Sequence, residues 1–286
     1  MRLLRLSETD TSGATVFKEP TAQPVALVGG MALIALAIIY GGAQSDQAFM
    51  SVLGGGLLLM ATWMGWVVRT AFLPTNWVLA IDARRVLVHF RPYVNTTFPT
   101  DDPQVLEIAH GEIAGARRTE VTVTERIRNN VVSRPRVYLT LRLKDADLGE
   151  FRERLRYELT FRSRGVTLCH HPVGTRGRDE IRVGWAGTSA WLRPKIDQAL
   201  WLLTPHVAVD PDERMAVDLT HPQTVDPRAR DWYLNALLQQ GEPNEALACA
   251  MRLYGVGMNE ARQRLAELEA REPSLAAAPG PGESLA

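Results

Sequence analysis

The sequence predicts a membrane-anchored α+β protein. It comprises an N-terminal transmembrane hairpin of two helices, an antiparallel β domain closed by an amphipathic helix, and a small C-terminal helical hairpin. Two long uncharged stretches predict the anchor, because Asp46 is the only charged residue between Glu19 and Arg69. Alternating apolar residues after residue 75 predict strands, and apolar residues at helical spacing after residue 190 predict helices.

The N-terminal quarter of the chain contains the predicted anchor. Residues 1–24 are expected to form a cytoplasmic arm, and residues 25–73 the transmembrane hairpin, with helices at about 25–43 and 49–72. Each run is long enough to cross a bilayer core, which takes ~20 apolar residues as a helix. A backbone in lipid must satisfy its own polar groups, which a helix does. Close helix packing, which small residues permit, is expected at Gly30, Gly54, Gly55 and Gly56.

Basic residues flank the predicted hairpin but are absent from residues 44–47, which join its helices. Cytoplasmic flanks carry an excess of Lys and Arg, so both termini are expected in the cytoplasm. The flanking bases are Arg2, Arg5 and Lys18 before the hairpin and Arg69, Arg84 and Arg85 after it. The tryptophans expected in an aromatic belt at the inner face are Trp63, Trp66 and Trp77.

Two other interpretations of the uncharged runs stay open. The first run could be a signal peptide cleaved after Ala43, or both runs could form a buried hairpin of a soluble protein. The segment before them is long for a signal peptide and contains Glu8, Asp10 and Glu19. The many glycines are ordinary in membrane helices. A transmembrane hairpin is therefore the favoured interpretation.

Charge is distributed unevenly along a chain whose formal net charge is zero. Residues 112–182 contain 16 basic and 10 acidic residues, whereas residues 205–286 contain 7 basic and 13 acidic residues. Guanidinium groups match phosphate geometry well, so the basic stretch suggests lipid contacts, although a simply solvated arginine surface fits it as well. The candidate contacts to lipid phosphates are Arg117, Arg118, Arg126, Arg128, Arg134 and Arg136.

Residues 76–204 are expected to form the cytoplasmic β domain. Residues 76–81 and 86–90 alternate around a turn, which predicts a hairpin, and further strands are expected at 105–109, 114–124, 137–143, 166–170 and 181–185. Residues 125–135 are expected to be a polar loop and residues 149–160 a surface helix. The closing helix is expected at residues 190–203, with one apolar stripe formed by Leu192, Ile196, Leu200 and Leu203.

This order of elements resembles the bacterial membrane proteins that carry a pleckstrin-homology-like domain. The resemblance covers residues 76–204 and depends on NWVLAIDARRVLVHF (76–90) and IAHGEIAGARRTEVTV (108–123). It implies a bent antiparallel sheet plugged by a C-terminal helix, in a multi-pass protein of the bacterial inner membrane. The family binds lipids, peptides or neighbouring proteins and has no shared catalytic residues.

The C-terminal region is expected to contain a linker at residues 205–230, a helical module at 231–271 and a disordered tail at 272–286. Residues 241–265 resemble the helical hairpin in the C-terminal domain of the ribosomal stalk protein. The matching positions are Ala246, Leu247, Arg252, Gly255, Gly257, Met258, Glu260 and Ala261. The resemblance implies protein docking, although the family's lysines are missing, and a generic hairpin packing on its own chain is the alternative. The docking candidates are Leu247, Met251, Arg252, Val256 and Met258.

No motif for catalysis, a metal or a cofactor occurs in the sequence. In Cys169-His170-His171, only Cys169 and His171 can share one side of a strand, and Cys249 lies far away, so neither a metal site nor a disulfide is expected. The favoured function is a non-enzymatic adaptor or accessory subunit of a larger membrane complex, which contacts the lipid bilayer and docks membrane or cytoplasmic proteins but not nucleic acid. The alternatives are an anionic-lipid-binding module and an enzyme without a recognisable motif.

Overall fold

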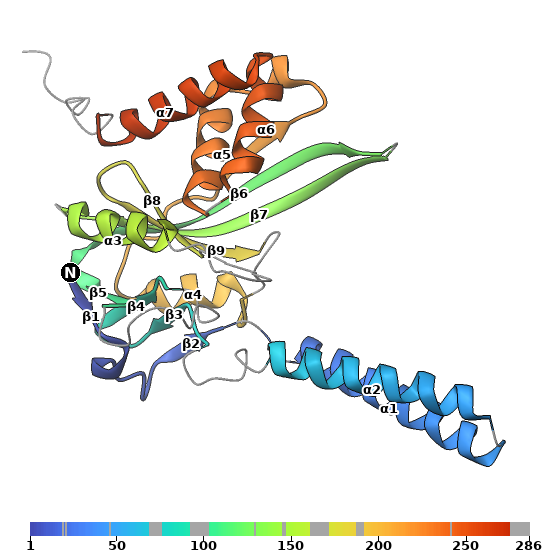
Figure 1. Cartoon of the computed structure of the whole chain (residues 1–286). Helices are drawn as coiled ribbons and strands as arrows, with labels where there is room; N and C mark the ends of the chain where they lie inside the picture. The colour runs from blue at the N-terminus through green and yellow to red at the C-terminus, as the bar shows by residue number, and fades with distance from the viewer. Residues whose placement is uncertain are drawn as a thin grey trace, which may run out of the picture. The chain divides into compact units, whose positions relative to one another are not determined.

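The computed structural model describes residues 1–18, 20, 22–45, 47–68, 76–91, 103–128, 130–144, 147–160, 172–186, 192–240 and 242–274 (Figure 1). The chain divides into two compact units, residues 19–77 and residues 1–18 together with 78–286. The protein is of mixed α+β class, with two apolar helices near the N-terminus and two sheets.

The smaller unit is a pair of helices, α1 (Ala22–Gln44) and α2 (Ala48–Val68). Residues 25–44 and 48–66 are long and apolar enough to cross a membrane. Ala35 and Ala61 are buried, whereas Leu33, Phe49 and Leu59 are at least 70% exposed. Small residues therefore lie inside the pair and large apolar residues cover its outside, which is the arrangement expected of a helix pair in lipid.

The first sheet has five antiparallel strands in the order β1-β5-β4-β3-β2. The predicted hairpin at residues 76–90 is confirmed as β3 and β4, and the predicted strand at residues 105–109 as β5. Residues 1–18 are not a separate arm, because they supply both edge strands, and Phe17 is fully buried against Trp185 of the second sheet. The strands are β1 (Arg2–Leu4), β2 (Thr15–Phe17), β3 (Leu79–Ile81), β4 (Arg85–His89) and β5 (Val105–Ala109).

The second sheet is mixed, with the order β10-β6-β7-β9-β8. Only β10 runs parallel to its neighbour, β6. The prediction of a linker at residues 205–230 is wrong, because Met215 and Val217 pack into the apolar core above β6 and hold β10 there. The strands are β6 (Ile113–Ile127), β7 (Asn130–Leu143), β8 (Val173–Arg176), β9 (Glu180–Ala186) and β10 (Glu213–Asp218).

The paired strands β6 and β7 extend beyond the rest of the second sheet (Figure 1). The pairing with β10 stops at Thr124 and the pairing with β9 stops at Val137. The prediction of a loop at residues 125–135 is wrong, because the cross-strand ladder continues through Glu125↔Val132 to Ile127↔Asn130. Residues 125–128 and 130–132, here called the β6–β7 arm, therefore have no other strand beside them among the described residues.

The two sheets pack face to face over one apolar core. Val137, Leu139, Leu141 and Leu143 point into it, which confirms the predicted apolar face of this strand. The helix α4 (Ile196–Leu203) closes the core and begins later than predicted, because the ring of Pro194 disfavours helical backbone at the residue before it. The helix α3 (Gly149–Thr160) is confirmed and buries Phe151 in the same core.

Three helices cover the other face of the second sheet (Figure 1). They are α5 (Pro227–Gln239), α6 (Pro243–Tyr254) and α7 (Met258–Ser274). Trp232 and Tyr233 of α5 pack with Tyr138 and Val121 of the sheet in a second apolar core. The helical module and the β domain, expected to be separate, therefore belong to one compact unit.

Candidate functional site

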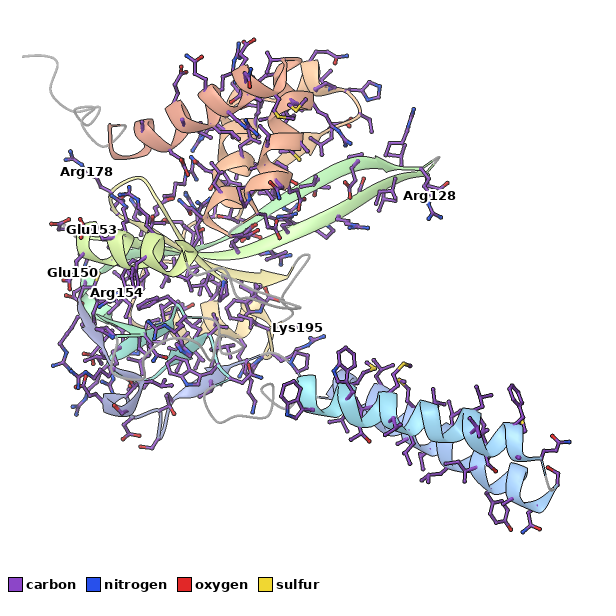
Figure 2. All side chains as sticks on the ribbon, viewed as in Figure 1. Arg128, Glu150, Glu153, Arg154, Arg178 and Lys195 are labelled. Carbon is purple, nitrogen blue, oxygen red and sulfur yellow. The ribbon has the colours of Figure 1, made fainter. Side chains whose placement is uncertain are left out.

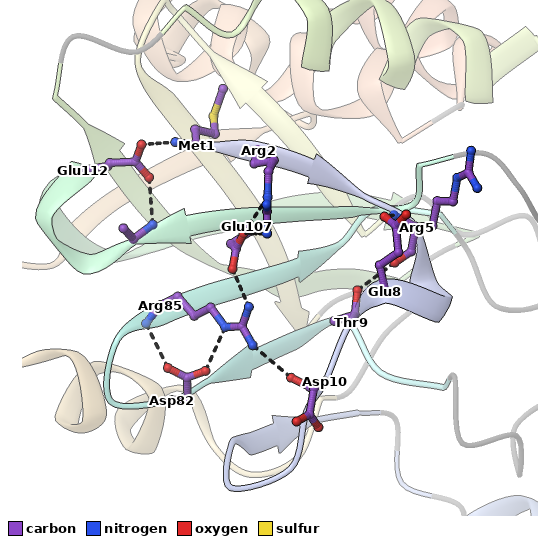
Figure 3. A network of polar contacts seen from close by, with 11 residues as sticks. Met1, Arg2, Arg5, Glu8, Thr9, Asp10, Asp82, Arg85, Glu107 and Glu112 are labelled. Carbon is purple, nitrogen blue, oxygen red and sulfur yellow. Dashed lines mark hydrogen bonds and ion pairs between the residues drawn. The ribbon is translucent and has the colours of Figure 1, made fainter.

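A network of charged side chains joins β1, at the edge of the first sheet, to the neighbouring strands of that sheet (Figure 3). Arg85 is its centre: Nε donates to Asp82 Oδ2 at 3.1 Å, Nη1 donates to Glu107, and Nη2 donates to the Asp10 carbonyl at 3.3 Å. Arg2 pairs with the same Glu107 at 2.9 Å. An open hollow of about 770 Å³ is bordered by Arg2, Asp82, Arg85 and Glu107.

The electrostatics of this network do not suit proton transfer. The hydrogen bond from Arg85 holds the pKa of Glu107 below its usual value. For Asp82, burial acts in the opposite direction, but hydrogen bonds from Arg84 and Arg85 still lower the pKa. A general acid or base needs a pKa near the working pH, and both carboxyl groups are moved away from neutrality. The network therefore stabilises the fold by joining β1, β4 and β5.

A second hollow of about 450 Å³, here called the helical cleft, lies between α3, β8, α5 and α7. Leu155, Val173 and Leu238 supply apolar surface. Arg152 and Arg156 lie on the α3 wall and Glu269 lies on the α7 wall. The cleft is thus apolar inside and charged at its borders, as in sites that bind a small molecule or a peptide side chain.

One wall of the helical cleft is fixed by partly buried hydrogen bonds. Gln239 Oε1 accepts from Arg182 Nη2 at 2.6 Å and from the Thr175 backbone N–H at 3.1 Å. Arg182 is only 3% exposed, and its guanidinium lies 4.8 Å from the centre of the Trp232 ring. These contacts join α5 to β8 and β9, so this wall is preorganised.

The six arginines proposed as lipid contacts occupy different environments. Arg117 pairs with Glu180 at 2.7 Å and Glu213 at 3.1 Å, and Arg118 pairs with Glu120 at 3.1 Å. Arg134 lies 3.7 Å from Glu125. Only Arg126 and Arg128 are exposed without an ion pair to another described residue.

Arg136, the sixth candidate, is buried where β7 meets α6, so it does not face lipid. Its Nη1 donates to Gln240 at 3.1 Å, its Nη2 lies 3.3 Å from Glu245, and its guanidinium is 5.3 Å from the centre of the Tyr233 ring. Glu242 lies 3.8 Å from Arg136. Burial, and then the charge of Glu245, raise the pKa of Glu242 to about 7, despite the attraction of Arg136.

The five proposed docking residues are only partly available. Leu247, Met251 and Val256 pack against the second apolar core and stabilise the helices. Arg252 is exposed, and Met258 is 49% exposed. The hairpin resemblance therefore corresponds mainly to internal packing, which leaves two exposed side chains from this set.

Of the four glycines predicted to pack closely, Gly54 lies in the contact between α1 and α2. A Cβ added there would lie 2.6 Å from Ile39 Cγ1 and 2.9 Å from the Ala35 carbonyl oxygen, so α1 and α2 approach closely at this point. A Cβ at Gly30, Gly55 or Gly56 meets nothing within 4 Å among the described residues. Consecutive helical residues are about 100° apart, so neighbours of Gly54 point elsewhere. Gly42, which was not predicted, lies against Met50 and Ser51.

Some predictions lie outside the described residues. They include the strand at residues 166–170 and the Cys169-His170-His171 cluster, and most of the tail at residues 272–286. Among the described residues, no three His, Cys, Asp or Glu side chains are close enough to hold a metal ion. Trp77 is buried and does not face a lipid interface, whereas Trp63 and Trp66 are exposed.

The helical cleft was not predicted from the sequence. Its walls come from segments between residues 152 and 270, and no local pattern indicates that they meet. The alternating Met215 and Val217 were the available signal that β10 exists and brings α5 back over the sheet. The chain matches no protein-family model, and comparisons with curated proteins and with solved structures find no match.

Proposed function

We propose that this chain is a non-enzymatic adaptor of the bacterial inner membrane, anchored by α1 and α2, that docks a protein partner in the cytoplasm. The large apolar side chains exposed on both helices support the anchor. Bases at both ends of the hairpin, and none in its connection, support cytoplasmic termini. An accessory subunit of a larger membrane complex has these properties.

The helical cleft is the single observation that carries the docking role. Leu155 and Leu238 offer apolar surface inside it, and the exposed Arg156 lies at its border. A peptide segment with an apolar side chain followed by a carboxylate complements this arrangement, because guanidinium pairs well with carboxylate. We therefore propose an acidic, partly apolar segment of a partner protein as the occupant.

An enzyme is less well supported by the same residues. The acidic groups of the Arg85 network are held ionised. Burial raises the pKa of the Cys249 thiol to about 11, which opposes formation of the reactive thiolate. Glu242, with a pKa of about 7, is placed beside Arg136 inside the fold and does not line the helical cleft. These groups support structural roles.

Site-specific photo-cross-linking in native membranes tests this function. A photoreactive amino acid at Asn235, inside the cleft, should give one dominant adduct, and the same probe at Glu153, elsewhere on α3, should not (Figure 2). Arg156→Glu should reduce the adduct at least fivefold. Arg154→Glu is the matched control, since Arg154 lies over the Tyr157 ring instead of lining the cleft.

Three outcomes would contradict the proposed docking site. Equal adducts at the two probe positions would show collision without a site. An adduct insensitive to Arg156→Glu would remove the charge argument. A cross-linked peptide without an acidic residue beside its apolar one would exclude the proposed occupant.

A further inference from the structure

The end of the β6–β7 arm carries apolar side chains on both of its faces. Arg126 and Val131 are direct partners across the ladder, so they share a face. Ile127 follows Arg126 and points to the opposite face. Val131 is 57% exposed and Ile127 is 38% exposed. A flat protein surface can cover only one of these faces, whereas a fluid interface can surround both.

The charge of the arm is concentrated at the same end. Arg126 and Arg128 are exposed and form no ion pair with a described residue, and Arg128 adopts a left-handed backbone with φ of 57° at the turn (Figure 2). Glu125, at the base of the arm, lies 3.7 Å from Arg134 in the adjoining part of β7, so these two charges balance each other. The unbalanced positive charge of the arm is therefore at its tip.

The open edge of β7 is not suited to a partner's strand. Pro135 lies next to the arm in β7 and has no N–H to donate, and natural proteins use such prolines to block edge pairing. A partner would therefore contact the exposed side chains of the arm and not its backbone. Bases interleaved with aliphatic side chains match the boundary between lipid headgroups and acyl chains.

We propose that the tip of the β6–β7 arm inserts into the interface of an anionic bilayer. Ile127 and Val131 reach the acyl boundary, and Arg126 and Arg128 contact lipid phosphates. Each favourably placed base strengthens binding to an anionic leaflet about fivefold. Two bases bind weakly alone, but an anchored chain keeps the arm at high local concentration near lipid. In this respect the inference rests on the proposed anchor.

An environment-sensitive dye on the full-length chain tests the insertion. The dye is attached at Ile127→Cys in a Cys169→Ser background; Cys249 does not compete, because it is buried and its thiol pKa is raised to about 11. The chain is reconstituted in phosphatidylcholine vesicles with or without 30% phosphatidylglycerol. The control dye position is Met258→Cys, another exposed apolar residue.

The expected result is a blue shift at position 127 only with phosphatidylglycerol, and no shift at position 258. Replacing Arg126 and Arg128 by Glu should reduce the anionic response at least tenfold, and a pair of neutral Gln replacements should give an intermediate loss. No difference between positions 127 and 258, or an equal response in zwitterionic vesicles, would overturn the proposal. A blue shift at position 127 that occurs in native membranes but not in pure lipid vesicles would also overturn the proposal, because it would show that the tip contacts a protein.

Alkaline carbonate washing of the same vesicles separates this proposal from the anchor. A chain retained by the washed vesicles with a silent dye contradicts the tip insertion alone. A chain released by the wash contradicts the anchor, and with it the proposed membrane location.

Discussion

Phe17 and Leu79 are direct partners in the antiparallel pairing of β2 with β3, although α1 and α2 both lie between them in the chain. The two helices are therefore an insertion into a β-hairpin of the first sheet. Phe17 and Leu79 are both fully buried. Residues 1–18 of the predicted 1–24 arm are therefore part of the β domain, whereas residues 22–24 belong to α1.

The contact between α1 and α2 depends on Gly54. We expect Gly54→Leu to destabilise the helix pair by about 1–3 kcal/mol, because its side chain would overlap Ile39 and the backbone at Ala35. Gly55→Leu is the matched control and should change stability little, since a Cβ there meets no described atom. Thermal unfolding of the full chain in mild detergent measures both. Equal effects would place the helix contact on another face.

The buried Arg136 is expected to stabilise the attachment of α6 to β7. Arg136→Met should lower the free energy of unfolding by about 2–4 kcal/mol, because it leaves Glu242 and Glu245 without their cation. Urea unfolding followed by tryptophan fluorescence measures the change. Arg134→Met, at a half-exposed position of the same strand, should cost less than about 1 kcal/mol. Similar losses in both variants would contradict a special role for Arg136.

Glu242 is expected to make stability depend on pH near neutrality. Its pKa in the fold is about 7, against an ordinary value of 4.5, because burial and Glu245 oppose its charge. Its stabilising contribution is therefore fully present below pH 4.5 and is lost as the pH rises through 7. A shift of this size corresponds to about 3 kcal/mol at full strength, and solvent screening of the partly exposed Glu242 reduces the expected loss to about 2 kcal/mol. Glu242→Gln should remove it. An unchanged pH profile in this variant would assign the dependence to another group.

The Arg85 network has the opposite dependence on pH. The pKa of Glu107 is lowered, mainly by the hydrogen bond from Arg85, so its contribution is present above its ordinary pKa of 4.5. It is lost as the pH falls through the lowered pKa. Glu107→Gln should therefore be less stable than the unchanged protein at pH 7. Its acid unfolding should lack the pH-dependent loss of stability that Glu107 causes. Arg85→Gln should reproduce both changes, and failure to do so would separate the two residues.

Several features follow from local sequence. The 25–44 and 48–66 runs are long and apolar whatever surrounds them, so their helices are readable without a structure. Alternation in residues 137–143 identifies the buried face of β7. Gly255, with φ of 65°, ends α6, and glycine adopts this left-handed backbone at little cost. In each case neighbouring residues decide the outcome.

Tertiary structure decided the rest, because short segments depend on distant partners. The three-residue strands β1 and β2 carry little signal of their own and gain their hydrogen bonds from β5 and β3. Arg117, Arg126 and Arg136 are chemically identical, and only the carboxylates brought near them by the fold separate a paired or buried side chain from a free one. The helical cleft exists because four distant segments meet. Sequence determines each residue's chemistry, whereas burial and charge pairing depend on neighbours that only the folded chain supplies.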